Sequence, residues 1–214
     1  MQIFIDTAEI SEIEKYAYLV DGVTTNPTLL AKLGKSCSIE EVIGKIAKIV
    51  PGPISVEVIS ETCDGMVMEA QQLAKLSPNI VIKIPMTEEG LKAAIILRKL
   101  NIKTNVTLIF SANQALLAAK AGATYASIFV GRLDDQGTNG MQVVRDSLEI
   151  FNNYSMRTKI IAASIRNPCH VLDAAKIGCH ITTIPPAIIS LMIKHKLTES
   201  GLEQFINDSK NFHQ

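Results

Sequence analysis

The feature that most constrains the fold is a regular alternation of short apolar segments with helical segments along the 214 residues. Eight segments have the Val, Ile and Thr content of buried strands. They are expected at, or within, residues 2–6, 22–26, 54–59, 81–87, 103–109, 125–130, 159–164 and 180–184. Strands that are joined by helices run parallel. Eight such units in about 200 residues fit a closed (β/α)8 TIM barrel better than an open doubly wound sheet.

Helical patterns separate these strands. The first helix is expected to begin with Thr7 as its N-cap, and Gly122 is expected to end the helix at 112–121. Further helices are expected near 39–50, after a loop at 34–36, and near 64–76, 88–100, 141–152, 168–177 and 186–192. A Rossmann fold would need a G-x-G-x-x-G motif after a strand, and the sequence has none.

An additional amphipathic helix is expected at about 198–212, which a barrel does not require. We expect it to pack on the barrel rim or on a neighbouring subunit. The sequence has no linker or low-complexity stretch, so residues 1–214 are expected to form a single domain that includes this helix.

The composition bears on the partners, the location and the metal content of the protein. The 21 basic side chains balance the 21 acidic ones, which argues against nucleic acid or an anionic membrane as a partner. No run of 18 apolar residues and no signal peptide is evident, so a cytoplasmic location is expected. Four cysteines lie far apart. The pairs Cys169-His170 and Cys179-His180 suggest a metal site, but acidic companions are missing, so no metal is expected.

Lys83 is the most informative polar residue, because it lies at the end of an apolar strand within 81–87. Burial disfavours the charged form of an amine and favours the neutral, nucleophilic form. Such a lysine can condense with a carbonyl compound to give a Schiff base. The alternative is a lysine at a strand edge that reaches solvent along its aliphatic chain.

Polar residues also occur at the carboxyl ends of the other expected strands, where barrel enzymes have their active sites. Three pairs are spaced i, i+2, so both members of a pair are expected on the same side of a strand. The residues are Asp6, Asn26, Glu57, Lys83, Asn105 with Thr107, Ser127 with Phe129, and Ser164 with Arg166. A packed barrel interior favours Val, Ile or Leu at such positions.

These residue types suggest separate chemical roles. Glu57 and Thr107 could hold a water that shuttles protons while a carbinolamine forms at Lys83. Asp6 could take a proton from a sugar hydroxyl as a carbon–carbon bond breaks. A phosphate dianion could be bound by charge-assisted hydrogen bonds from Arg132, Arg166, Ser127 and Ser164.

Each residue also has a plain structural alternative. Asp6 alone is more often a strand-end or cap residue, and Glu57 alone is more often a paired carboxylate at the rim. Arg132 could simply pair with Asp134 or Asp135. The convergence of all these groups on one rim favours a catalytic site over the separate alternatives.

Six segments resemble those of one known family, the small-subunit transaldolases and their relatives, the fructose-6-phosphate aldolases. These segments are Phe4-Ile5-Asp6-Thr7, residues 22–28 (GVTTNPT), residues 81–87 (VIKIPMT), Thr104-Asn105-Val106-Thr107, Phe129-Val130-Gly131-Arg132 and Ala163-Ser164-Ile165-Arg166. The resemblance extends from Met1 to about Ile206. It implies a (β/α)8 barrel that binds sugar phosphates and uses no metal or organic cofactor.

The resemblance also implies residue roles. It places the Schiff-base lysine at Lys83, the acid/base at Asp6, and the partners of the catalytic water at Glu57 and Thr107. It implies substrate or phosphate contacts at Asn26, Asn105, Ser127, Phe129, Arg132, Ser164 and Arg166. Family members form rings, so a homo-oligomer, pentamer or decamer, is implied.

The family has two branches. In the aldolase branch the positions of Phe129, Glu57 and Arg166 typically hold tyrosine, glutamine and lysine, so this chain, which also has Asn105, resembles the transferase branch. We therefore expect a transaldolase of the pentose phosphate pathway, with fructose-6-phosphate aldolase as the alternative. A sugar-phosphate-binding barrel without turnover is a third possibility, but mere binding has no need of a buried nucleophile.

Overall fold

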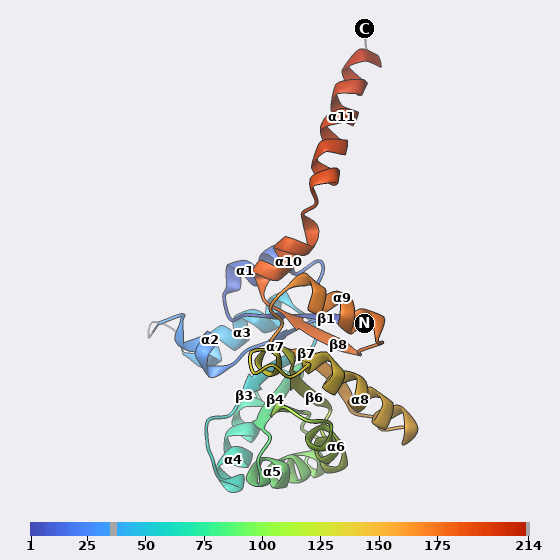
Figure 1. The fold of residues 1–214 in the computed structure, drawn as a ribbon. Helices are drawn as coiled ribbons and strands as arrows, with labels where there is room; N and C mark the ends of the chain where they lie inside the picture. The colour runs from blue at the N-terminus through green and yellow to red at the C-terminus, as the bar shows by residue number, and fades with distance from the viewer. Residues whose placement is uncertain (35–37, 213–214) are drawn as a thin grey trace.

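The computed structural model describes residues 1–34 and 38–212, and eight parallel strands in it close into a barrel (Figure 1). Each strand pairs with its neighbours in sequence, and β8 returns to pair with β1. The strands are β1 (Gln2–Asp6), β2 (Gly22–Thr24), β3 (Ile54–Glu57), β4 (Ile80–Pro85), β5 (Thr104–Ile109), β6 (Tyr125–Phe129), β7 (Lys159–Ala163) and β8 (Ile181–Ile184). The predicted (β/α)8 TIM barrel is confirmed.

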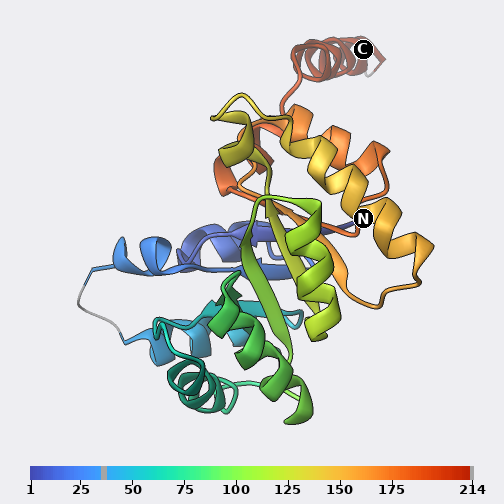
Figure 2. The ribbon, with the colours of Figure 1, turned by 60° about the horizontal axis from the view of Figure 1, so that its bottom comes forward.

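The helices from α1 to α9 lie between successive strands in the chain, around the barrel wall, and α10 and α11 follow the last strand (Figure 2). They are α1 (Ile10–Tyr16), α2 (Pro27–Ala31), α3 (Ile39–Ile49), α4 (Cys63–Leu73), α5 (Glu88–Lys99), α6 (Ala112–Ala121), α7 (Val130–Asp134), α8 (Gly140–Asn153), α9 (Pro168–Lys176), α10 (Pro186–Ile193) and α11 (Lys196–Phe212). As predicted, Gly122 ends α6 in the left-handed conformation. Within the described part of the chain, no helix combines the length and the apolar character needed to cross a bilayer.

The first helix begins later than predicted. Its N-cap is Glu9 rather than Thr7. The Thr7 hydroxyl instead accepts a hydrogen bond from the backbone N–H of Glu9, 3.1 Å away, which forms a local turn before the helix. The predicted loop at 34–36 falls mostly outside the described residues.

Several strands end one or two residues earlier than predicted, because the residues that follow them have other local partners. Asn26 caps α2 with its side chain, so β2 ends at Thr24. Ser164 has a left-handed backbone (φ +58°), so β7 ends at Ala163. β5 ends at Ile109 as predicted, but its pairing register with β6 shifts between Val106 and Ile109, around a left-handed Leu108.

The core has two apolar layers. The larger one lies between the barrel wall and the helices, where for example Ile82 faces outward and Leu97 of α5 is buried. The smaller one fills the barrel interior with Phe4, Val81, Phe129 and four further side chains, Tyr125, Ile161, Ala163 and Ile181. The rings of Phe4 and Tyr125 meet edge to face, with centroids 6.1 Å apart. A Cβ on Gly22 would lie 2.8 Å from a carbon of the Phe4 ring, so glycine is required where β2 crosses this layer.

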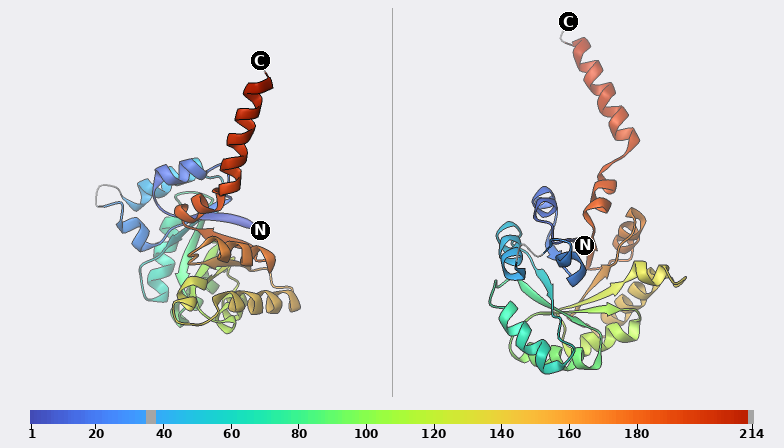
Figure 3. Two further views of the ribbon diagram at one scale, coloured as in Figure 1. Left: turned by 45° about the horizontal axis from the view of Figure 1, so that its top comes forward. Right: turned by 90° about the vertical axis from the view of Figure 1, so that its left-hand side faces the viewer.

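The C-terminal helix α11 extends away from the barrel (Figure 1, Figure 3). Lys194, the C-cap of α10, has an extended backbone, which turns the chain outward. The apolar side chains of α11 are therefore largely exposed: Leu197, Leu202, Phe205 and Ile206. The expected helix is present. Of the two packings expected for it, packing on its own barrel rim is excluded, and packing on a neighbouring subunit stays a prediction.

Candidate functional site

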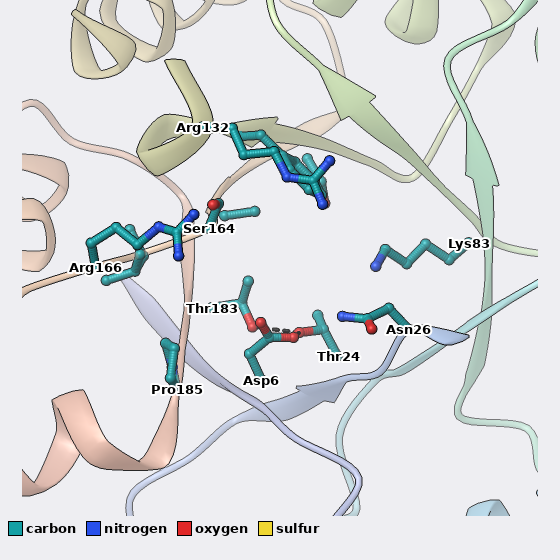
Figure 4. Close-up of a pocket in the computed structure, with 13 residues that line it drawn as sticks. Asp6, Thr24, Asn26, Lys83, Arg132, Ser164, Arg166, Thr183 and Pro185 are labelled. Carbon is teal, nitrogen blue, oxygen red and sulfur yellow. Dashed lines mark hydrogen bonds between the residues drawn. The ribbon is translucent and has the colours of Figure 1, made fainter. Parts of the chain in front are cut away.

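A polar cavity of about 210 Å³ opens among the residues at the carboxyl ends of the strands (Figure 4). Thirteen residues line it: Asp6, Thr24, Asn26, Lys83, Ser127, Phe129, Arg132, Ala163, Ser164, Ile165, Arg166, Thr183 and Pro185. A second cavity of about 380 Å³ adjoins the first and shares Asn26, Lys83, Phe129 and Arg132 with it. Glu57 and Leu108 line this second cavity only. Lys83 therefore lines both cavities.

Lys83 is buried, with 5% of the residue exposed, and its amine has two protein partners. The Nζ atom lies 3.0 Å from Oε2 of Glu57 and donates a hydrogen bond to the backbone oxygen of Thr25, 3.1 Å away. The ion pair follows from the sheet register, which places Glu57 of β3 beside Lys83 of β4. An ammonium has three donors, so one is left for a ligand.

Two expectations about Lys83 are revised by this geometry. Lys83 is the fourth of six residues in β4 and not at its very end, because Ile84 and Pro85 continue the pairing with β5. The alternative of an edge lysine that reaches solvent is excluded, because the amine is enclosed beside Glu57.

Asp6 lines the first cavity from β1, beside Thr24 (Figure 4). Its Oδ1 atom accepts a hydrogen bond of 2.8 Å from the Thr24 hydroxyl, which is also 2.6 Å from the Thr183 hydroxyl. Burial raises the pKa of Asp6 above its ordinary value, although the charge of Lys83 and the Thr24 hydrogen bond act to lower it. A carboxylate with a raised pKa is a stronger base.

A chain of hydrogen bonds crosses the barrel interior at Asn105. The Ser127 hydroxyl donates to the side-chain oxygen of Asn105 over 2.7 Å, and the Asn105 amide nitrogen donates to the Ser55 hydroxyl over 3.1 Å. Asn105 is fully buried and lines neither cavity, so it supports Ser127, which does line one.

Thr107 is also fully buried and lies outside both cavity linings. In the described residues, its hydroxyl is the one buried side-chain oxygen or nitrogen without a hydrogen-bond partner. A buried hydroxyl without a partner is rare in folded proteins and calls for a water or a ligand group. The hydroxyl is therefore free to bind a water, and the role expected for it beside Glu57 stays a prediction.

The side chain of Asn26 both caps a helix and lines the cavity. Its Oδ1 atom accepts the N–H of Leu29, 2.9 Å away, and so caps α2. The amide nitrogen is left over as a donor, and Figure 4 shows it extending into the same space as the Lys83 amine.

Phe129 and Arg132 form one wall of the site. The Phe129 ring packs against Phe110 with centroids 5.8 Å apart, and the Arg132 guanidinium lies 5.1 Å from the Phe129 ring centre. The alternative in which Arg132 pairs with a neighbouring aspartate is wrong. Asp135 pairs with Arg166 over 2.9 Å, and Asp134 contacts His170 over 3.1 Å.

Ser164 and Arg166 both line the cavity, although not as strand neighbours. The expectation that their i, i+2 spacing places them on one side of a strand is wrong, because Ser164 follows β7 with a positive φ. Gly131 allows this loop to approach α7: its N–H donates to the Ser164 carbonyl over 3.1 Å, and a Cβ there would lie 2.2 Å from that oxygen.

Sequence analysis missed Thr24, Thr183 and Ser55, which support Asp6 and Asn105. Thr24 precedes Asn26 by two residues, and Ser55 precedes Glu57 by two, so the period of a strand could have indicated both. Thr183 could not be identified in this way. Threonine is common in strands because its side chain is β-branched, so its presence there does not indicate a functional role.

The chemistry that the site can perform rests on a buried amine, two carboxylates in different environments and two arginines. Across residues 1–34 and 38–212, no group of three or more His, Cys, Asp or Glu side chains is placed to hold a metal ion. A neutral amine could attack a carbonyl, Asp6 could accept a proton, and the arginines could bind an anion.

Comparisons with known proteins identify the family of the chain. The model of the family described as Transaldolase/Fructose-6-phosphate aldolase matches residues 3–214. A probable transaldolase of Geobacter sp. (strain M21) is 59% identical, with 97% of each chain covered. A probable transaldolase of Thermoanaerobacter sp. (strain X514) is 57% identical, with 97% of this chain and 96% of that protein covered.

Comparison with a solved structure of low sequence identity concerns the fold only. Thiamine phosphate pyrophosphorylase from Pyrococcus furiosus has a TM-score of 0.58 with 14% sequence identity, and the match covers 86% of this chain and 85% of that one. The family match and the close relatives together decide the assignment. The chain belongs to the transaldolase/fructose-6-phosphate aldolase family, and its activity is of the transaldolase type.

Proposed function

We propose that the protein transfers a dihydroxyacetone unit from a ketose phosphate to an aldose phosphate through a Schiff base on Lys83. The donors are fructose 6-phosphate or sedoheptulose 7-phosphate, and the acceptors are erythrose 4-phosphate or glyceraldehyde 3-phosphate. The observation that carries the proposal is a buried amine, 3.0 Å from a carboxylate, in a cavity that two arginines also line.

The first step forms the Schiff base. Glu57 accepts a proton from Lys83, and the neutral amine then adds to the C2 carbonyl of the ketose to give a carbinolamine. The carbinolamine hydroxyl takes a proton and leaves as water, so that a protonated imine remains. Glu57 is close enough to return that proton, and the partnerless hydroxyl of Thr107 supports a bound water as the carrier.

The second step breaks the C3–C4 bond. Asp6 takes the proton of the C4 hydroxyl, the C4 aldehyde leaves as the aldose phosphate, and the electrons of the broken bond form an enamine with the imine on Lys83. The raised pKa of Asp6 supports its role as the base. The enamine carbon then attacks the acceptor aldehyde, Asp6 returns its proton to the new alkoxide, and water releases the product from Lys83.

The remaining polar residues would bind the substrate. Arg166 and Ser164 lie on the side of the first cavity away from Lys83, and Arg132 lies between them and Lys83; together they fit a phosphate group (Figure 4). Asn26 and Ser127, with Asn105 behind Ser127, would hold the hydroxyl groups of the dihydroxyacetone unit.

The principal alternative is a fructose-6-phosphate aldolase, in which water replaces the aldose acceptor. Phe129 favours the transferase, because its ring offers no hydroxyl to assist water beside the intermediate, and Arg132 and Phe110 cover that ring. A binding protein without turnover would share the arginines. It would not explain the buried ion pair of Lys83, which is expensive to desolvate.

The pathway and the assembly complete the proposal. The pentose phosphate pathway, in the cytoplasm, is the setting that the family resemblance implies for these substrates. A homo-oligomer, pentamer or decamer, is supported by α11, where Leu197, Leu202, Phe205 and Ile206 are largely exposed in a single chain.

The choice between transferase and aldolase is tested by the release of glyceraldehyde 3-phosphate from fructose 6-phosphate. We expect release to require erythrose 4-phosphate. Phe129→Tyr should raise the release without acceptor by about tenfold, which corresponds to a barrier lowered by about 1.4 kcal/mol. Acceptor-independent release by the wild type would establish the aldolase, and an unchanged rate in Phe129→Tyr would remove the role given to this residue.

The Schiff base is tested by borohydride reduction in the presence of fructose 6-phosphate. We expect a mass gain corresponding to a reduced dihydroxyacetone adduct on a peptide that contains Lys83. Lys83→Met should lower turnover by about 10⁴-fold or more. Because this change removes the partner of Glu57, the double variant Lys83→Met/Glu57→Gln serves as a second test that leaves no unpaired carboxylate. Turnover retained in either folded variant would place the nucleophile elsewhere.

Asp6→Asn separates catalysis from stability. Turnover should fall by about 10²- to 10⁴-fold. Because burial raises the pKa of Asp6, the protonated side chain favours the folded state, and this contribution is lost as the pH rises through the raised pKa. Asparagine remains neutral, so the variant should have a higher Tm than the wild type at pH 7.

The gain in Tm should shrink as the pH falls toward the ordinary aspartate value of 3.8. Asp173→Asn, a change at an exposed residue of α9, is the control and should show no such trend. A Tm difference for Asp6→Asn that does not change with pH would contradict the role of burial.

The assembly is tested by light scattering of the full chain. We expect a mass of five or ten times the 23.3 kDa of one chain. Replacement of Phe205 and Ile206 by serine should lower that mass, because it removes two exposed apolar side chains of α11. A monomer at micromolar concentration would overturn the proposed assembly without affecting the proposed chemistry.

A further inference from the structure

The two arginines of the cavity have different electrostatic surroundings. The Arg132 guanidinium lies over the Phe129 ring and forms no ion pair within the described residues. The Arg166 guanidinium donates from Nη2 to Oδ2 of Asp135 over 2.9 Å. Arg166 lines the cavity while it makes this contact, and Asp135 does not line the cavity. One cation is therefore fully available to an anion, and the other is shared with a carboxylate.

The contact between Arg166 and Asp135 is fixed by the elements around Arg166. Gly131 and Asp135 are four residues apart in and just after α7, so they lie on the same side of that helix. The aliphatic chain of Arg166 lies against Gly131, where a Cβ would come within 2.6 Å of the Arg166 Cγ.

The backbone of Arg166 is held as well. Its N–H donates to Nδ1 of His170 over 3.4 Å, and Nε2 of the same ring lies 3.1 Å from Asp134. Asp134 also accepts the N–H of Gly140 at the start of α8, 2.8 Å away. The side chain and backbone of Arg166 are both anchored, so the proximity to Asp135 is built into the fold of this loop.

The ion pair of Arg166 and Asp135 has little to contribute to folding. Both side chains are more than half exposed, at 54% and 59%, and ion pairs between exposed groups add little stability. The ion pair has a larger effect on the binding of an anion in the cavity than on folding. The Asp135 carboxylate occupies one donor of Arg166 and also repels a phosphate dianion.

We propose that Asp135 lowers the affinity of the cavity for phosphorylated sugars by sharing the charge of Arg166. The inference rests on the proposed function, in which Arg132, Arg166 and Ser164 bind the substrate phosphate. Asp135 is thus a positioning residue that tunes affinity without contact to the reacting atoms.

The proposed reaction explains why a lower affinity for phosphate would be useful. Each cycle releases one aldose phosphate and admits another at the same arginines while the dihydroxyacetone unit stays on Lys83. A cavity that holds the phosphate too tightly would delay that exchange, because release of the first aldose phosphate must precede entry of the second.

The experiment compares Asp135→Asn with Asp173→Asn, which removes the same charge from an exposed position of α9 away from both catalytic cavities. Inorganic phosphate is the probe, and its inhibition constant is measured together with KM for fructose 6-phosphate and for unphosphorylated fructose. In Asp135→Asn we expect both the inhibition constant and KM for fructose 6-phosphate to fall by about 3- to 10-fold. KM for fructose should not change, and Asp173→Asn should match the wild type.

The outcomes separate the two claims. Constants for phosphate and fructose 6-phosphate that are unchanged or higher in Asp135→Asn would overturn the inference, and so would an equal fall in KM for fructose. A wild type that phosphate does not inhibit, and that uses fructose as readily as fructose 6-phosphate, would instead overturn the proposed phosphate site. A fall in Asp173→Asn equal to that in Asp135→Asn would show a general charge effect and would also overturn the inference.

Discussion

The ion pair of Lys83 and Glu57 is the interaction on which the rest of the site depends. Moving two charges out of water is unfavourable unless their geometry is good and their other hydrogen-bonding groups are satisfied. The barrel provides the geometry, because the register of β3 and β4 places the two residues side by side, and the Thr25 carbonyl accepts a second of the three hydrogen bonds that the amine can donate. Beneath them, Phe4, Val81 and the other interior side chains fill the barrel and exclude water from that side.

The two carboxylates near Lys83 have different surroundings, and this difference is what acid–base chemistry requires. Glu57 is paired directly with the amine, whereas Asp6 accepts a hydrogen bond from the Thr24 hydroxyl and has a pKa raised by burial. The arginines occupy a third region around Phe129 and the loop after β7. The amine, the Asp6 carboxylate and the arginines therefore line one cavity from separate elements of the barrel.

The sequence was sufficient for those features that local chemistry determines. The alternation of segments predicted the barrel, Gly122 predicted the end of α6, and strand-end polarity predicted most of the cavity lining. Features that depend on contacts between distant segments were out of reach. Thr183 meets Thr24 across 159 positions, and Arg166 pairs with Asp135 where only the nearer Arg132 had been considered. The direction of α11 was also missed, because it depends on the backbone conformation of a single residue, Lys194.

The pairing of β1 with β8 has a consequence for biosynthesis. Gln2 pairs with Ile181, so the barrel wall cannot close until almost the whole chain has been made. At about 5–20 residues per second, the first strand waits on the order of ten seconds or more for its partner. During that time the nascent sheet has two open edges, which can pair with other chains. The apolar strands of this protein are thus most exposed to aggregation on the ribosome, before the last βα unit emerges.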